Sequence, residues 1–148
     1  MFLQYRHQLV TRAFLYANDY VCEGEVYSQP TSLPLYPKSV YSRRRFYKRN
    51  IIGNQVFTWA WRFKACLFDT TLKAAQDYDI FLRMVVAYGK PWKVKEATQI
   101  LHVNHGEMRI TSSPNKFSGY FQFYRKHKGK FDRASQEISA VYPLSDPQ

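Results

Sequence analysis

The sequence predicts a mixed α/β fold, because segments with strand and helix patterns alternate along the chain. Residues 13–17 form a short apolar run of strand length, residues 74–88 carry apolar side chains at helical spacing, and residues 94–103 contain alternating segments. The chain has 148 residues, of which 45% are hydrophobic and 18% aromatic, enough for one domain with a sizeable core. Disordered and multidomain classes are therefore excluded.

The N-terminal third is expected to contain one helix end, one or two strands and a loop. The first dozen residues have apolar side chains among polar ones, as at the end of an amphipathic helix. The buried strand at residues 13–17 should end at Asn18-Asp19, followed by a turn at residues 23–25 and a candidate strand at residues 26–28. Residues 29–39 hold three prolines, Pro30, Pro34 and Pro37, which predict a surface loop.

The remaining elements follow from charge and hydrophobic patterns. A basic helix is expected over residues 40–48, and residues 51–61 form an apolar, β-prone run broken by Gly53. The clearest helix covers residues 74–88, with cap-forming residues at 69–71 before it and Gly89 and Pro91 ending it. Residues 94–103 are expected to be a strand, and residues 116–128 the last helix.

Positive charge is concentrated in two segments. The chain has 22 Lys and Arg against 11 Asp and Glu, a net charge of +11. No acidic residue occurs from Val26 to Phe68, and a second basic cluster extends from Lys116 to Arg133, interrupted only by Asp132. An anionic partner is expected, with nucleic acid, phospholipid headgroups and a pyrophosphate-bearing substrate all left open.

Cysteine content and hydropathy predict a cytoplasmic protein. Cys22 and Cys66 are the two cysteines, too few for a disulfide framework and not spaced as zinc ligands. The N-terminus lacks the apolar core of a signal peptide, and no stretch approaches the roughly 18 apolar residues of a membrane span.

Two carboxylates at the start of the clearest helix are candidates for different roles. Asp79 lies four residues before Arg83, a spacing that allows an ion pair on one helix face. Asp77 has Ile80 and Phe81 at the corresponding positions, so its side chain should point to solvent or into a cleft. A carboxylate at a helix start beside a cleft can act as a general base, although the helix dipole alone also favours an acid there.

The residues after the predicted third strand are a second polar group. Alternation places His102 and Asn104 on one face and His105 on the other, so a site with two histidine ligands is not expected, although one histidine could bind a metal. Arg109 follows in a predicted loop and could bind phosphate oxygens through its planar guanidinium.

Aromatic residues form a stripe on the last predicted helix. Phe117, Tyr120, Phe121 and Tyr124 lie at positions i, i+3, i+4 and i+7, with Arg125, Lys126 and Lys128 close behind. The stripe is interpreted either as part of the core or as an interfacial face that contacts a membrane, and Phe121 is expected to be a core residue.

Three segments together resemble the C-terminal half of family 2 glycosyltransferases with the GT-A fold, and most closely the bacterial O-antigen glucosyl- and galactosyltransferases. These segments are residues 50–57 (NIIGNQVF), 67–84 (LFDTTLKAAQDYDIFLRM) and 102–111 (HVNHGEMRIT). The resemblance covers residues 14–133. It implies a Rossmann-like α/β fold, with residues 1–133 forming the acceptor-side half of the domain and residues 134–148 an unassigned tail.

The resemblance also implies site residues. Asp77 corresponds to the family's catalytic base, and Phe68, Asp69 and Gln76 correspond to residues that shape the acceptor site. Arg109 would bind the donor diphosphate. His105 is the first choice and His102 the second for a ligand of a divalent cation, Mn²⁺ or Mg²⁺.

By the same resemblance, the reaction would be an inverting transfer of a hexose from a UDP-sugar to a polyprenyl-diphosphate-linked sugar in O-antigen or lipopolysaccharide biosynthesis. The basic segments would then contact the anionic inner membrane from the cytoplasmic side. The family's nucleotide-binding half and Asp-x-Asp motif have no counterpart, and Asn18-Asp19-Tyr20 does not replace that motif. The chain is therefore expected to be truncated and inactive alone.

The alternative function is a non-enzymatic basic module that binds nucleic acid or an anionic membrane. In it, aromatic side chains would stack on bases while Lys and Arg neutralise phosphates. It leaves the QDYD helix start at residues 76–79 unexplained, and no known RNA-binding motif is present. Nucleic acid is therefore not expected as the partner.

Overall fold

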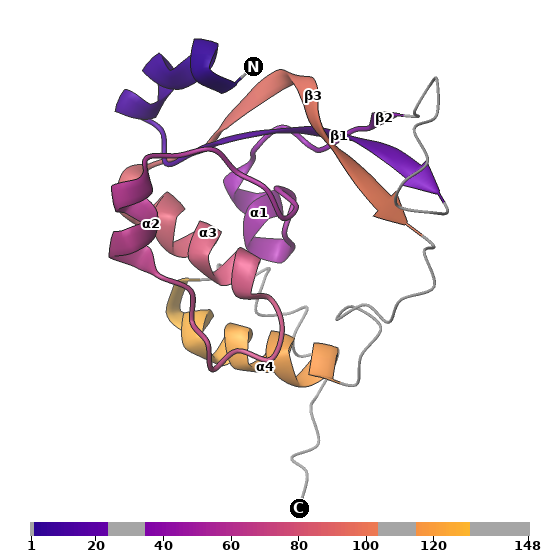
Figure 1. Ribbon diagram of the computed structural model, residues 1–148. Coiled ribbons are helices and arrows are strands. Elements are labelled where there is room, and N and C mark those ends of the chain that lie inside the picture. Colours follow the sequence, from indigo (N-terminus) through magenta and orange to yellow (C-terminus); the bar gives the residue numbers. More distant parts are fainter. Residues whose placement is uncertain (1, 24–34, 104–114, 131–148) are drawn as a thin grey trace, which may run out of the picture.

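The computed structural model describes residues 2–23, 35–103 and 115–130 (Figure 1). Its elements are the 3-10 helix η1 (Phe2–Val10), strands β1 (Leu15–Glu23) and β2 (Leu35–Tyr36), helices α1 (Arg43–Lys48), α2 (Ala60–Cys66) and α3 (Gln76–Tyr88), strand β3 (Trp92–Val103), helix α4 (Asn115–His127) and the 3-10 turn η3 (Lys128–Lys130). The described part is therefore a mixed α/β structure, as the sequence predicts.

The described strands form a three-stranded sheet in the order β2-β1-β3. β1 and β3 are parallel, with a register that runs from Leu15 opposite Trp92 to Glu23 opposite Val103. β2 pairs with β1 antiparallel at the edge. Because β1 and β3 run the same way, their carboxyl ends meet at one edge of the sheet.

The start of β1 is buried on both faces of the sheet. Phe14 and Tyr16 belong to the cluster that includes α1 and α3, whereas Leu15 and Ala17 pack with Leu9 of η1. Figure 1 shows the same layers, with η1 on one side of the sheet and α1, α2 and α3 on the other. This double burial is why the sequence there is a continuous apolar run rather than an alternating one.

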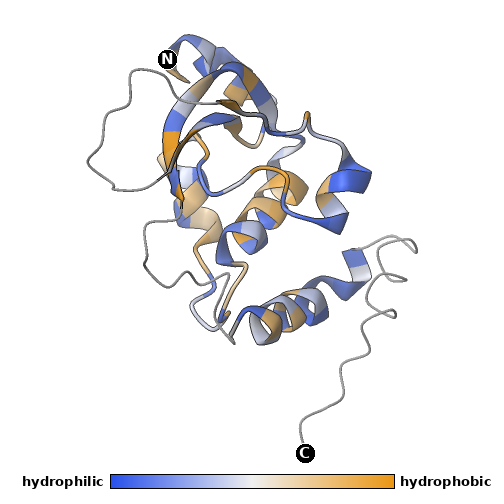
Figure 2. Cartoon of the chain, turned by 90° about the vertical axis from the view of Figure 1, so that its right-hand side faces the viewer, coloured by the Kyte–Doolittle hydropathy of each residue, from blue (hydrophilic) through white to orange (hydrophobic). Residues whose placement is uncertain are grey.

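α3 is the central helix of the larger core. Its buried residues include Tyr78, Ile80, Phe81, Leu82 and Met84. Apolar colour gathers where the helices and the sheet face one another, while both colours alternate along α4 at the bottom of the view (Figure 2). Gly89 ends α3 with a φ of 91°, a conformation that favours glycine.

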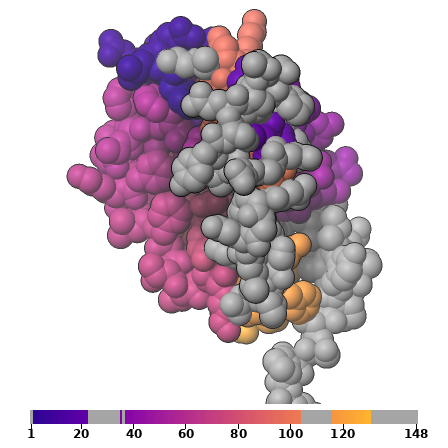
Figure 3. Space-filling view, turned by 45° about the vertical axis from the view of Figure 1, so that its right-hand side comes forward, coloured from indigo at the N-terminus to yellow at the C-terminus, as the bar shows by residue number. Residues whose placement is uncertain are grey.

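α4 packs against α3 and the loop before it. Phe123 stacks on Tyr78 with ring centroids 4.3 Å apart. Gly119 lies so close to Ala74 that a Cβ built on it would be 2.2 Å from the Ala74 backbone nitrogen. In the space-filling view, α4 lies below the continuous surface of the segments that contain α2 and α3, with η1 above (Figure 3).

The buried Arg62 of α2 ties that helix to the start of the chain. Its guanidinium donates hydrogen bonds to the backbone oxygens of Leu9, Arg12 and Ala13. It also lies over the rings of Trp61 and Tyr88. Burial lowers the pKa of Arg62, and the three carbonyl acceptors replace the water that the guanidinium loses.

Several expectations at the N-terminal end need correction. The helical N-terminus is a 3-10 helix, and β1 continues through Asn18 and Asp19 to Glu23 instead of ending there. Both polar side chains have partners inside the fold, which removes the cost of burying them. The turn at residues 23–25 is described only at Glu23, and the candidate strand at 26–28 lies outside the described residues.

The apolar, β-prone run at residues 51–61 does not form a strand. Phe57 makes only an isolated bridge to Leu15, and α2 begins at Ala60. The side chain of Asn50 accepts hydrogen bonds from the backbone nitrogens of Ile52 and Gly53 and donates one to the Gly53 oxygen. These local bonds fold residues 50–53 into a turn, which competes with strand pairing.

The aromatic stripe on α4 is not the core face of that helix. Phe117 and Tyr120 are exposed, and Phe121 and Tyr124 are partly buried, whereas Phe123 and His127 are buried. The expectation that Phe121 belongs to the core was therefore wrong. No helix within the described ranges is long and apolar enough to cross a membrane.

Candidate functional site

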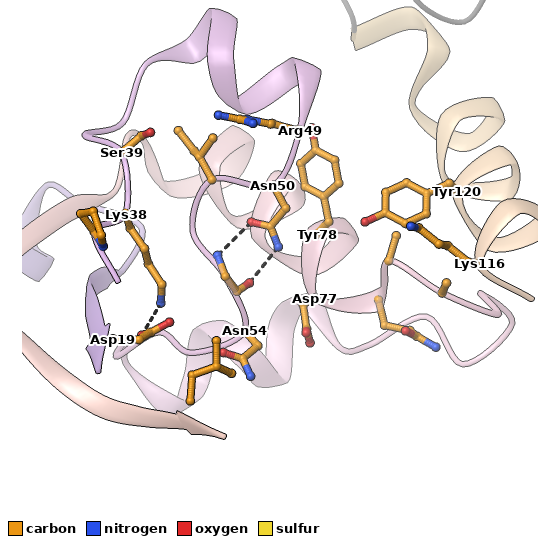
Figure 4. Close-up of a pocket in the computed structure, with 17 residues that line it drawn as sticks. Asp19, Lys38, Ser39, Arg49, Asn50, Asn54, Asp77, Tyr78, Lys116 and Tyr120 are labelled. Carbon is orange, nitrogen blue, oxygen red and sulfur yellow. Dashed lines mark hydrogen bonds and ion pairs between the residues drawn. The ribbon is translucent and has the colours of Figure 1, made fainter. Parts of the chain in front are cut away.

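A pocket of about 480 Å³ lies where the carboxyl ends of β1 and β3, the turn after α1, the start of α3 and the helix α4 meet (Figure 4). Most of the residues that line it are polar, and they include both acidic and basic side chains. The polar residues that line it include Asp19, Lys38, Ser39, Arg49, Asn50, Asn54, Gln76, Asp77, Tyr78, Lys116 and Tyr120.

Asp77 projects from the first turn of α3 into this pocket (Figure 4). The helix begins directly after Ala75, whose φ of 63° turns the chain sharply into the helix. Asp77 is partly buried and makes no hydrogen bond or ion pair with any described residue, and burial raises the pKa of its carboxyl. A carboxylate in this position can accept a proton from a bound hydroxyl group.

Asp79, two residues further, is fully buried on another side of the same helix. Its carboxylate contacts Arg83 at 2.6 Å, Lys126 at 2.9 Å and His127 at 2.7 Å. Burial alone would raise the pKa of Asp79, but the hydrogen bonds from His127, Lys126 and Arg83 outweigh it and hold the pKa well below its usual range. The predicted pairing with Arg83 is confirmed, and Asp79 holds α3 and α4 together.

An ion pair that sequence reasoning missed forms the sheet side of the pocket. Lys38 Nζ lies 2.8 Å from Asp19 Oδ1, and both side chains are almost fully buried. Gln99 of β3 donates to the same carboxylate oxygen at 2.6 Å and contacts Asn54 Oδ1 at 3.2 Å. The parallel pairing of β1 and β3 brings Asp19 and Gln99 together, and no local sequence pattern indicates this pairing of residues far apart in the chain.

The turn after α1 supplies the next part of the wall. Gly53 has a φ of 90°, and a Cβ there would lie 2.8 Å from the side chain of Lys38. A glycine at this position therefore leaves room for the Lys38 ammonium to reach Asp19. Asn54 follows it and faces the cavity beside Asp77 (Figure 4).

The three predicted acceptor-binding residues are not all at this pocket. Gln76 lines it, with its side-chain nitrogen bonded to the Leu72 oxygen at 2.7 Å. Phe68 stacks on Phe63 and is absent from the lining. Asp69 is also absent from the lining; its hydrogen bonds from Lys126 and Thr71 lower its pKa to about 2.

Of the predicted metal and diphosphate ligands, only His102 lies within the described part of the chain, in β3 opposite Cys22. His105 and Arg109 fall outside it. The described residues contain no group of three or more His, Cys, Asp or Glu side chains that could hold a metal ion.

The chain is 84% identical, over 137 residues, to a protein of Escherichia coli strain K12 that is provisionally named as the colanic acid biosynthesis glycosyl transferase WcaA. The match covers 93% of this chain and 49% of that relative. The chain thus spans about half of the relative's length. No protein-family model matches the chain, and no solved structure matches it.

Proposed function

We propose that this chain is the acceptor-binding part of an inverting glycosyltransferase of family 2 with the GT-A fold. The reaction would transfer a hexose from a UDP-sugar to a sugar on a polyprenyl diphosphate, in bacterial surface polysaccharide biosynthesis. The observation that carries the proposal is the unpaired, partly buried carboxylate of Asp77 in a polar pocket. The name of the E. coli relative supports the same class of reaction.

Asp77 would act on the acceptor sugar. As the acceptor hydroxyl oxygen forms its bond to C1 of the donor hexose, the bond from C1 to the diphosphate oxygen breaks and the hydroxyl proton passes to Asp77. A single displacement of this kind inverts the configuration at C1. The raised pKa of Asp77 makes its carboxylate a better proton acceptor than an exposed one.

The other polar residues of the pocket would position the acceptor. Asn54 and Gln76 offer amide donors and acceptors, and Tyr120 offers an aromatic face at the rim. Sugars present hydroxyls and apolar ring faces, so this combination suits them. The assignment of Arg109 to the donor diphosphate, and of His105 or His102 to a divalent cation, rests on the sequence resemblance alone.

The test uses a chimera in which this chain replaces the matching half of the E. coli relative. We expect the chimera to release UDP from UDP-glucose or UDP-galactose in the presence of membranes that contain lipid-linked acceptors. Asp77→Asn should lower that rate by about a hundredfold, the usual loss when a general base is removed.

Glu96→Gln is the matched control for the test. It is also a change from carboxylate to amide, but Glu96 bonds to Tyr5 of η1, away from the pocket. It should leave the rate of UDP release within about twofold, because Glu96 does not line the pocket around Asp77. Near-normal UDP release by folded Asp77→Asn chimera would remove Asp77 from the mechanism.

The non-enzymatic basic module is not favoured, because it does not use the pocket around Asp77 and the E. coli relative carries a glycosyltransferase name. A peripheral contact with an anionic inner membrane remains part of the proposal, since a polyprenyl-linked acceptor is bound to a membrane.

A further inference from the structure

A second pocket of about 480 Å³ lies at the opposite end of the parallel strands, where β3 begins. Four cationic residues line it beside Trp92, namely Arg12, Lys90, Lys93 and Lys95, and its described lining contains no carboxylate. The segment of residues 37–41 separates the two pockets, because residues 37–39 line the first and residues 40–41 the second.

Arg12 is held in place on an aromatic ring. Its guanidinium carbon lies 5.4 Å from the centroid of the Trp92 ring. Its Nε is buried and has no hydrogen-bond partner among the described residues. A buried donor without an acceptor is costly, and an anion would supply the missing acceptor.

The charge of Lys93 is also uncompensated by an acid. Its Nζ donates to the backbone oxygen of Lys38 at 2.6 Å. Burial and the nearby charge of Lys38 lower the pKa of Lys93. The acid that follows in β3, Glu96, is bonded to Tyr5 of η1. The pocket therefore concentrates positive charge in a lining without carboxylates, and of its four cations Lys95 is the one whose charge also acts on Glu96.

We propose that this second pocket binds a phosphate or diphosphate group, either free in solution or carried by a lipid headgroup. Guanidinium and ammonium groups that converge on a cavity without acids are the donors that phosphate oxygens bind best. The inference uses none of the residues assigned to the proposed transfer reaction, so either can fail without the other.

The test is a titration of the chain with inorganic pyrophosphate, followed through the indole N–H resonance of Trp92. Trp92→Phe identifies that resonance among the three tryptophans. We expect a saturable shift of the Trp92 signal while those of Trp59 and Trp61 stay in place. Arg12→Gln and Lys93→Gln should each weaken binding by about fivefold or more.

Controls separate this site from general attraction to a basic protein. The double variant Arg44→Gln/Lys73→Gln removes two exposed cations outside the pocket and should keep wild-type affinity. The double variant Lys90→Gln/Lys95→Gln changes exposed pocket residues and should also weaken pyrophosphate binding. It replaces the Arg12 variant as the test if that variant does not fold, and unchanged binding would then contradict the proposal. Equal weakening in the Arg44/Lys73 control would overturn the proposal.

Phosphatidylcholine vesicles with and without phosphatidic acid distinguish the two phosphate sources. Binding to phosphatidic acid that needs Arg12, without a pyrophosphate shift, assigns the site to headgroups. A pyrophosphate shift without Arg12-dependent vesicle binding assigns it to soluble phosphates. If neither probe binds through Arg12, the proposal is wrong.

Discussion

Asp77 and Asp79 are two residues apart on α3, yet their carboxylates have opposite surroundings. Asp77 faces the pocket without a described partner, whereas Asp79 is buried among Arg83, Lys126 and His127. Helical geometry causes the contrast, since residues two positions apart point to different sides of a helix. The two acids should therefore respond in opposite ways to removal of their charge.

Asp77→Asn should raise the melting temperature at neutral pH. Burial raises the pKa of Asp77 in the folded state, so the charged carboxylate costs stability above that pKa. The cost disappears as the pH falls below the unfolded value, about 3.9, because the acid is then protonated in both states. Thermal melts of both proteins from pH 3 to pH 8, by circular dichroism, test this sign. A lower melting temperature for Asp77→Asn at pH 7 would contradict it.

Asp79→Asn should lower the free energy of unfolding by about 3 kcal/mol at pH 7, because it removes the fully buried carboxylate on which Arg83, Lys126 and His127 converge. The pKa of Asp79 is lowered in the folded state, so the stability it contributes is present above about pH 4 and is lost as the pH falls through the folded pKa. Urea titrations at pH 7 and pH 3 measure the difference, which should shrink at the lower pH. Asp69→Asn is the control. It removes a carboxylate from a partly exposed ion pair and should change the free energy of unfolding little.

At the scale of elements, α4 is attached through close backbone approach as well as through charge. Gly119 allows that approach, because its Cβ position is already occupied by the Ala74 backbone. The Lys73 amide also donates to Gln122 across the same contact at 3.2 Å. α4 thus closes the pocket by supplying Lys116 and Tyr120 to its rim.

Gly119→Ala should lower the free energy of unfolding by about 2 kcal/mol, since the new methyl group overlaps a backbone that cannot move aside cheaply. Helix propensity alone predicts the reverse, a gain of up to about 1 kcal/mol. Gly129→Ala is the matched control, because a Cβ there has nothing within 4 Å. Chemical denaturation of both variants decides between packing and propensity. Equal stability of the two would mean that α4 does not pack as described.

At the scale of the whole molecule, the cations divide into those used inside the fold and those left on the surface. Lys38, Arg62, Arg83 and Lys126 have partners within the described structure. Arg125 and Lys128, near the end of α4 and in η3, are exposed, and exposed Phe117 lies on the same helix. A test of membrane binding must therefore spare Lys126, whose loss would also break its pair with Asp79.

The double variant Arg125→Glu/Lys128→Glu should weaken binding to anionic vesicles by about tenfold or more, since each cation near such a surface contributes about 1 kcal/mol. Vesicle sedimentation with phosphatidylglycerol at rising salt measures it, and the affinity should fall as salt screens the attraction. Arg44→Glu/Arg45→Glu on α1 carries the same charge change as a control. Equal loss in both variants would show that net charge, not this face, directs binding.

Local sequence patterns were sufficient to predict the long helices and the long strand β3. The sequence predicted the helix at residues 74–88, its end at Gly89, the β3 segment and the last helix. Each of these depends on the periodicity of its own apolar residues and on the residues that begin and end it. The ion pair of Asp79 with Arg83 was also predictable, since both residues lie on one helix. Asp77 could be singled out for the same reason, by its lack of a partner at helical spacing.

The tertiary structure decided what depends on residues far apart in the chain. The parallel pairing of β1 with β3 brings Gln99 to Asp19, and the turn at Gly53 lets Lys38 reach the same carboxylate. Local hydrogen bonds of Asn50 outweighed the β propensity of residues 51–61. The buried face of α4 was set by its neighbours, which selected Phe123 over Phe121, because a helix with apolar residues on several sides fixes no face by sequence alone.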